Sequence, residues 1–145
     1  MIFFNKPYIT GKETSYLTEA VKLGKISGNG HFTKLCHAYF KKLFNNSHNL
    51  CTTSCTDALE MTAILANIKP GDEVIMPTYT FVSTANAFIL RGAKVIFVDS
   101  REDHPGMDED KIEELVNAKT KAIVPVHYAG VACDMDKILA IAKKH

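Results

Sequence analysis

A short run of small polar residues, Thr53-Ser54-Cys55-Thr56-Asp57, stands directly before an apolar stretch of helical composition. The first amide groups of a helix have no partner inside the helix, and the helix dipole makes their surroundings positive. Together with side-chain hydroxyls, such amides can hold a phosphate group. The same residues are also compatible with an ordinary helix cap, in which Ser54 or Thr56 accepts a backbone hydrogen bond. Both interpretations remain open from the turn alone.

Aromatic and imidazole side chains follow two apolar segments further along the chain. Tyr79 and Phe81 come shortly after the first segment, and His127 and Tyr128 come directly after the second. A flat aromatic face can position a heterocyclic ring, and a histidine can hold or transfer a proton near neutral pH. A core position at the start of a helix remains the alternative for Phe81. A structural hydrogen bond remains the alternative for His127.

The elements that must position these residues alternate between strand and helix from residue 49 onward. The pattern predicts strands at 49–52, 73–76, 94–98 and 121–126 and helices at 57–67, 81–90 and 108–117, with a last helix capped by Asp134. Strands that are apolar on both faces indicate a mostly parallel sheet with helices on both faces, so the fold class is α/β. Ligands of such sheets bind beyond the carboxyl ends of the strands, which is where the polar turn and both aromatic groups fall.

Residues 1–48 have a helical pattern of their own. Thr10 and Glu13 form a capping box for a helix that runs to about Leu23, with an inward face of Leu17, Ala20 and Val21. A second amphipathic helix has an apolar stripe that consists of Phe32, Leu35, Cys36, Tyr39, Phe40 and Leu43. The chain is therefore predicted to consist of a helical segment, 1–48, and a βα-repeat part, 49–145.

Composition narrows the classes of function. The chain has 145 residues and a net charge of +1, which fits one domain and gives no electrostatic footprint for nucleic acid or for an anionic membrane. No apolar run has the length of a membrane span. The four cysteines and six histidines lack the spacing of a metal site, so no metal is expected, and reduced thiols favour the cytoplasm.

Several blocks in order resemble the N-terminal part of the DegT/DnrJ/EryC1/StrS family, the pyridoxal-phosphate-dependent sugar aminotransferases with the aspartate aminotransferase fold. The blocks are Phe4-Asn5-Lys6-Pro7, Thr53-Ser54-Cys55-Thr56, Pro70-Gly71-Asp72-Glu73-Val74-Ile75, Tyr79-Thr80-Phe81-Val82-Ser83-Thr84-Ala85-Asn86, Gly92-Ala93 with Phe97-Val98-Asp99, and Val124-Pro125-Val126-His127-Tyr128-Ala129-Gly130. They extend over essentially the whole chain. The resemblance implies the N-terminal portion of the large domain of a type I PLP-dependent transferase, whose C-terminal remainder is absent here.

The resemblance also implies roles for particular residues. Cys55, Thr56 and Asp57 match the turn that holds the phosphate of pyridoxal 5'-phosphate (PLP) through backbone N–H groups and a hydroxyl. Phe81 matches the aromatic residue that stacks on the pyridine ring. The remaining candidates have no assigned step and are expected only at the rim of the active site: Tyr79, His127 and Tyr128.

The quoted blocks are most similar to family members that aminate a sugar nucleotide. By this resemblance the substrate is dTDP-4-keto-6-deoxyglucose and the amino donor is an amino acid, glutamate, with pyridoxamine phosphate formed during turnover. The implied process is the biosynthesis of surface polysaccharide, namely enterobacterial common antigen. A cytoplasmic homodimer is expected for the intact enzyme.

The family's Schiff-base lysine and the aspartate that pairs with the pyridine nitrogen lie in motifs downstream of residue 145. No lysine of this chain stands in a matching context, so no catalytic residue is expected within it and the chain alone is expected to be inactive. Two alternatives remain open: a truncated, non-catalytic fragment, and a pyridoxamine-phosphate-dependent sugar dehydratase of the same family. The stereochemistry at C4 of the sugar also remains open. The sequence leaves equally open whether the gene is interrupted or split.

Overall fold

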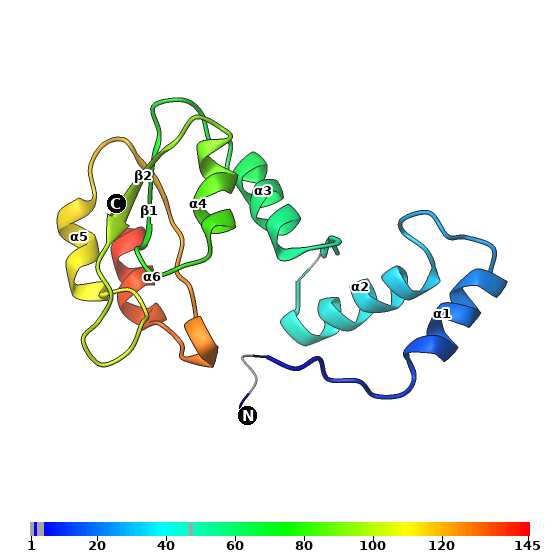
Figure 1. Ribbon diagram of the computed structural model, residues 1–145. Coiled ribbons are helices and arrows are strands. Elements are labelled where there is room, and N and C mark those ends of the chain that lie inside the picture. The colour runs from blue at the N-terminus through cyan, green and yellow to red at the C-terminus, as the bar shows by residue number, and fades with distance from the viewer. Residues whose placement is uncertain (1, 3–4, 47) are drawn as a thin grey trace. The chain divides into compact units, whose positions relative to one another are not determined.

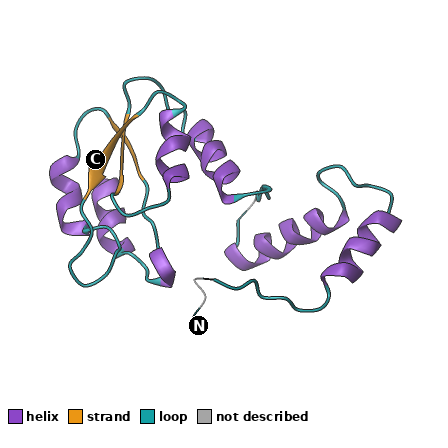
Figure 2. Ribbon diagram, in the orientation of Figure 1, coloured by secondary structure: helices purple, strands orange, loops and turns teal. Residues whose placement is uncertain are grey.

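The structure, a computed structural model, describes residues 2, 5–46 and 48–145. It consists of two compact units, Met1–Cys51 and Thr52–His145. Figure 1 shows the order of the elements, and Figure 2 shows that the strands all belong to the second unit.

The first unit contains two helices, α1 (Glu13–Lys22) and α2 (His31–Phe44). The Glu13 carboxylate accepts hydrogen bonds from the Thr10 amide and the Thr10 hydroxyl, both at 2.7 Å, so the predicted pairing of these two residues before α1 is confirmed. These bonds, which favour the charged carboxylate, lower the pKa of Glu13 to about 2. The start of α1 is thus fixed by contacts within four residues of sequence.

The predicted inward faces of α1 and α2 are wrong for the described residues of this chain. Neither helix contains a buried residue, and Leu17 is 67% exposed. An edge-to-face contact of Tyr16 and Phe32, with ring centroids 5.4 Å apart, joins the two helices. Two short helices have too little surface to cover each other's apolar stripes. The apolar spacing therefore predicts the helices correctly, but the predicted burial of their apolar side chains is wrong.

The predicted strand at 49–52 is wrong. The Cys51 amide donates to Nε2 of His37 at 3.3 Å, and Asn49 pairs with Asn46 through two amide hydrogen bonds of 2.8 and 3.0 Å. A strand exists only where a neighbouring strand takes up its backbone hydrogen bonds. The three described strands do not pair with this segment, and side chains satisfy it instead.

The second unit contains a parallel sheet of three strands in the order β2-β1-β3. The strands are β1 (Glu73–Pro77), β2 (Lys94–Val98) and β3 (Thr120–Ile123). The predicted parallel arrangement is therefore confirmed. The strand predicted at 121–126 is shorter than expected because Pro125 has no N–H to continue the ladder.

Helices cover both faces of this sheet, as predicted (Figure 1). On one face lie α3 (Cys55–Leu65) and α4 (Val82–Ile89). On the other lie α5 (Ile112–Leu115), which follows the short helix η1 (Glu109–Lys111), and α6 (Met135–Lys144). Val74 and Met76 pack against the first pair of helices and Ile75 packs against the second, which is the alternation of a strand buried on both sides.

Burial follows the position in the sheet more closely than it follows local hydropathy. The central strand β1 is buried at every residue, whereas β2 is an edge strand whose Phe97 is 50% exposed. The prediction that 94–98 is covered on both faces is therefore wrong. In α6, Ile138 is buried, but the neighbouring Leu139 is 59% exposed. In α3, which follows from an apolar stretch of sequence, Ala63 is the one buried residue.

Two turns at the amino ends of β1 and β2 pack together. Gly92 ends the turn after α4 with φ +88°, and its amide donates to the Ile89 carbonyl at 2.8 Å. A Cβ atom at Gly92 would lie 2.8 Å from Cγ and 3.0 Å from Cα of Pro70. Gly71 has a similar φ of +95°, but a Cβ atom there would have no neighbour within 4 Å.

These two glycines form a matched pair for a stability test. We expect Gly71→Ala to lower the free energy of unfolding by about 1 kcal/mol, because alanine resists the left-handed conformation. Gly92→Ala should lower it by about 2–3 kcal/mol, because the clash with Pro70 is added to the same conformational cost. Urea denaturation of both variants provides the measurement, and equal losses would contradict the packing described for Gly92.

Candidate active site

The start of α3 is held by the polar turn that precedes it. Ser54 is the N-cap, and its hydroxyl oxygen accepts from the Asp57 amide at 3.1 Å. The Thr53 hydroxyl donates to the Asp57 carboxylate. This leaves the amides of Cys55 and Thr56, the first two of the helix, without an acceptor among the described residues. The cap thus uses the Asp57 amide and leaves the Cys55 and Thr56 amides open to another acceptor.

Asp57 itself carries a negative charge at this turn. The hydrogen bond from the Thr53 hydroxyl, followed by that from Ser54, lowers the pKa of Asp57 below its usual value of 3.8. Its backbone amide is already engaged by the cap. Asp57 therefore holds the turn in shape through its carboxylate and its amide.

The start of α4 meets the start of α3 through side-chain hydroxyls. The Thr56 hydroxyl donates to the Ser83 hydroxyl oxygen at 3.1 Å, and both side chains are partly buried. Phe81, the residue before α4, has an extended backbone conformation and is 74% exposed. The alternative that Phe81 is a core residue is therefore excluded. An open aromatic face lies two residues before the hydroxyl that joins the two helices.

Two tyrosines from neighbouring strand ends form a second contact on the rim. Tyr79 follows β1, and Tyr128 begins the short helix η2 (Tyr128–Gly130) after β3. Their hydroxyl oxygens are 3.4 Å apart and their ring centroids are 4.8 Å apart at 74°. The hydrogen bond to Tyr79 raises the pKa of Tyr128 above 10.0. Tyr79 and Tyr128 are therefore in direct contact, and their placement at the rim of an active site stays a prediction.

His127 lies next to this pair and is bonded to the backbone. Its Nδ1 accepts from the Cys133 amide at 3.1 Å, and the Cys133 thiol lies 3.4 Å from the Val126 carbonyl oxygen. Because an amide can only donate, Nδ1 is unprotonated and the ring proton is on Nε2. The structural hydrogen bond that the sequence left open for His127 is therefore present.

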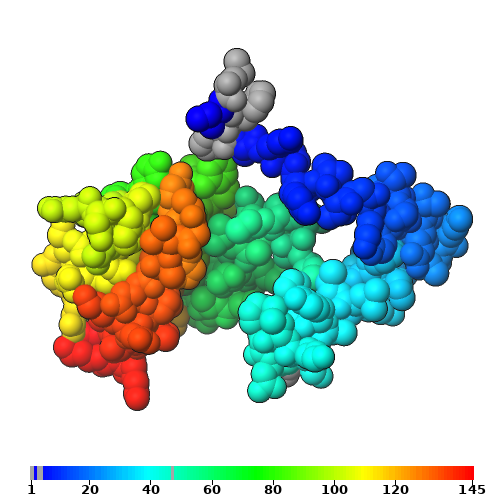
Figure 3. Space-filling model, turned by 90° about the horizontal axis from the view of Figure 1, so that it is seen from below, coloured from blue at the N-terminus to red at the C-terminus, as the bar shows by residue number. Residues whose placement is uncertain are grey.

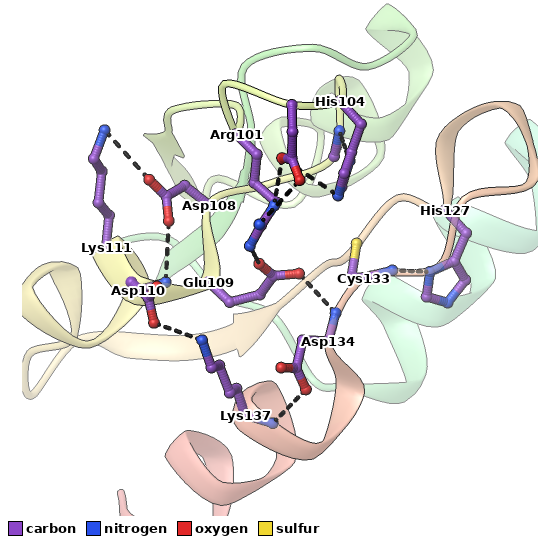
Figure 4. A network of polar contacts seen from close by, with 12 residues as sticks. Arg101, His104, Asp108, Glu109, Asp110, Lys111, His127, Cys133, Asp134 and Lys137 are labelled. Atoms are coloured by element: carbon purple, nitrogen blue, oxygen red, sulfur yellow. Dashed lines mark hydrogen bonds and ion pairs between the residues drawn. The ribbon is translucent and has the colours of Figure 1, made fainter.

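A buried carboxylate anchors the segment that carries His127. Glu109 is 2% exposed, and it accepts from the Asp134 amide at 2.6 Å and from Nη1 of Arg101 at 3.3 Å. Figure 4 shows this network joining the loop before η1 to the start of α6. In Figure 3 the same two segments, yellow and orange, lie side by side on the surface. A charged group this deeply buried needs both partners, so it fixes the loop that ends at α6.

The groups on this rim fit a phosphorylated flat ring. The free amides and the hydroxyl pair suit a phosphate, and the face of Phe81 suits a heterocycle. Ser83 is missing from the residues that the sequence predicts for the site, since its only signal is a hydroxyl at the third position of the predicted helix. A hollow of about 470 Å³ lies elsewhere, beside β3 and the end of α6. The candidate site is thus an open rim.

Within the described residues, no group of three or more His, Cys, Asp or Glu side chains could hold a metal ion. None of the helices described here has the length and apolar character needed to cross a membrane.

Comparison with known proteins gives concordant results. The family model for the DegT/DnrJ/EryC1/StrS aminotransferase family matches residues 7–145. The spore coat polysaccharide biosynthesis protein SpsC of Bacillus subtilis is 39% identical over 142 residues, which are 98% of this chain and 36% of SpsC. The GDP-perosamine synthase of Caulobacter vibrioides is 35% identical over 96% of this chain and 38% of its own length.

Among solved structures, the pyridoxamine phosphate (PMP) form of a sugar aminotransferase described as putative, Spr1654 of Streptococcus pneumoniae, is similar with a TM-score of 0.89. It is 33% identical, and the match covers 99% of this chain and 36% of that protein. The α/β fold predicted from the sequence is therefore that of a sugar aminotransferase. The chain spans little more than a third of the length of these relatives.

The tyrosine contact can be tested by titration. The raised pKa of Tyr128 means that the contact contributes stability below pH 10 and loses it as the pH rises through the value in the folded chain. We expect Tyr79→Phe to lower the pKa of Tyr128 toward 10, because the hydrogen bond to the Tyr79 hydroxyl is lost. NMR of ring-labelled tyrosine provides the measurement, with the exposed Tyr8→Phe as control. An unchanged Tyr128 titration in Tyr79→Phe would contradict the contact.

Proposed function

The chain belongs to the DegT/DnrJ/EryC1/StrS aminotransferase family, and from this premise we propose that it binds PLP at the start of α3. The phosphate accepts hydrogen bonds from the Cys55 and Thr56 amides, and the pyridine ring lies against Phe81. When bound, PLP supplies the electron sink that amino-group transfer requires. The observation that carries this proposal is the pair of free amides beside an exposed aromatic ring.

Two kinds of interaction at this site favour a ligand that consists of an anionic group attached to a ring. A phosphate at the start of a helix gains about 0.3–1 kcal/mol from the dipole, in addition to charge-assisted hydrogen bonds. Stacking on Phe81 adds about 0.5–1.5 kcal/mol beyond the burial of area. In this proposal Asp57 contributes by holding the turn through Thr53 and Ser54, because its own amide is engaged.

In this proposal, side chains beyond Phe81 orient the substrate that binds next to the cofactor. Tyr79 and Tyr128 offer ring edges and hydroxyl groups from two strand ends. His127 presents Nε2–H, since its Nδ1 is tied to the Cys133 amide. These groups can donate or accept hydrogen bonds with a polar substrate, and the network around Glu109 keeps their segment in place.

For the protein as a whole, we propose transamination of the 4-keto-6-deoxy sugar of a dTDP nucleotide, with glutamate as the amino donor, in surface polysaccharide biosynthesis. The similarity to a polysaccharide biosynthesis protein and to a perosamine synthase supports an amino sugar as the product. A homodimer in the cytoplasm is part of the same proposal. The dTDP nucleotide is proposed from the resemblance of the quoted sequence blocks, while one of the relatives is named for a GDP sugar.

We further propose that this chain alone does not turn over a substrate. Lys94 begins β2 and Lys121 lies near the start of β3, so both are at the amino ends of their strands. Lys69 lies in the turn before β1. The candidate site is at the opposite, carboxyl end of the sheet, which supports the view that none of these amines can attach the cofactor covalently.

Binding of PMP to the 145-residue chain tests the proposed site. PMP carries an amine in place of the aldehyde, so it cannot form covalent adducts with surface lysines. We expect PMP to bind at least about tenfold more tightly than pyridoxamine, because only PMP has the phosphate. Phe81→Ala should weaken both ligands by about tenfold, since it removes the ring platform. Equilibrium dialysis provides the dissociation constants.

The control is Leu139→Ala, which removes an exposed side chain from α6 on the opposite face of the sheet and should leave both affinities unchanged. Equal affinity of the unaltered chain for PMP and pyridoxamine would rule out the phosphate site. A Phe81→Ala variant that binds PMP as well as the unaltered chain does would rule out the ring platform.

A further inference from the structure

We propose that the buried Glu109 is a positioning residue for His127 and that it acts through two consecutive backbone amides. The arrangement holds the His127 ring so that Nε2–H is presented at the carboxyl end of the sheet, as a donor to an oxygen atom of the substrate. Only this use of the donor rests on the proposed function. The contacts that hold the ring do not depend on it.

Glu109 cannot touch a ligand itself, because it is buried and both of its oxygens are engaged. Oε1 accepts from the Asp134 amide at 2.6 Å, and Oε2 accepts from Nη1 of Arg101 at 3.3 Å. Arg101 is held in turn by Asp103, whose oxygens accept from Nε at 2.8 Å and from Nη2 at 3.2 Å. Any effect of Glu109 on the rim of the sheet must therefore pass through the backbone that it holds.

Two neighbouring amides connect Glu109 to His127. The Asp134 amide donates to Glu109, and the amide directly before it, that of Cys133, donates to Nδ1 of His127 at 3.1 Å (Figure 4). The Cys133 side chain is buried, and its thiol donates to the Val126 carbonyl oxygen at 3.4 Å. Because this side chain and the peptide group after it are both held, the position of the Cys133 nitrogen is set as well.

The loop between His127 and Cys133 needs support from outside, because its backbone conformation is not intrinsically favoured. Ala129 has φ +53°, in the left-handed region that alanine rarely adopts, and Gly130 follows with φ +82°. A conformation of this kind persists where the surrounding contacts hold it. Glu109 supplies such a contact at the end of the loop, from the helix η1.

The fixed ring makes His127 a hydrogen-bond donor. Because Nδ1 accepts the Cys133 amide hydrogen, the ring proton is on Nε2, and a proton added at Nδ1 would displace that amide. His127 is exposed, and its Nε2–H has no acceptor in the part of the chain that the structure describes. A keto, hydroxyl or carboxylate oxygen of a bound molecule fits this donor, and an ammonium group does not.

The test is the NMR scalar coupling across the hydrogen bond between the Cys133 amide nitrogen and Nδ1 of His127, measured on the ¹⁵N-labelled 145-residue chain. We expect the coupling in the unaltered chain and its loss in Glu109→Met, because methionine has the length of glutamate but no oxygen for the Asp134 amide. Glu109→Gln should keep the coupling, since its side-chain oxygen can still accept from that amide.

Glu113→Met is the matched control. Glu113 also joins α5 to the end of α6, through Lys144 and His145, but these partners lie outside the loop that carries His127. The coupling should be unchanged in this variant. If Glu109→Met does not fold, Glu109→Asp replaces it and should weaken the coupling, because aspartate keeps the charge but is one methylene group shorter.

Four outcomes would overturn the inference and leave the proposed cofactor site intact. These are an unaltered chain without the coupling, a folded Glu109→Met or Glu109→Asp variant with the full coupling, a Glu109→Gln variant without it, and an equal loss in Glu113→Met. A chain that shows the coupling but does not prefer PMP to pyridoxamine would instead contradict the proposed function, and with it the substrate contact of His127.

Discussion

The first amides of a helix cannot bond within that helix, and the candidate site depends on how this chain deals with that constraint. Ser54 satisfies the third amide of α3, and the Thr53 hydroxyl fixes the Asp57 carboxylate beside it. The first two amides have no acceptor in the part of the chain that the structure describes. A fully capped turn would have no place for an anion, and an uncapped one would fray. The partial cap keeps the turn ordered while two donors remain available.

The parallel sheet brings the other groups to that turn. The helices α3 and α4 come before and after the central strand β1 in sequence, and both pack on the same face of the sheet. Their first residues can therefore meet, as the contact between Thr56 and Ser83 shows. Tyr79 and Tyr128 join the ends of β1 and β3 in the same way. The buried Glu109 holds the last of these loops against α6. Each contact links residues that are distant in sequence, so the site is a property of the sheet topology more than of any motif.

The sequence predicts the elements with clear local patterns and the layered parallel sheet that their alternation implies, but it misses particular contacts between distant residues. The strand at 94–98 has the predicted bounds because its signal is contained in a few residues. The strand at 49–52 is wrong because pairing needs a partner that local hydropathy cannot reveal. The apolar stripe with Leu17 is real as a pattern, yet it is exposed because burial needs a covering surface. Ser83 escapes notice for the same reason, since its contact with Thr56 spans 27 positions.

The central claim is that the open amides of α3 hold the phosphate of the cofactor. The most direct measurement is a ¹H–¹⁵N NMR titration of the isotope-labelled chain with PMP and, separately, with pyridoxamine. The account predicts that the Cys55 and Thr56 amide protons shift downfield with PMP and move little with pyridoxamine, since hydrogen bonding to a phosphate oxygen deshields them. Cys55 and Thr56 signals that stay in place at saturating PMP would contradict the account, as would equal shifts with both ligands.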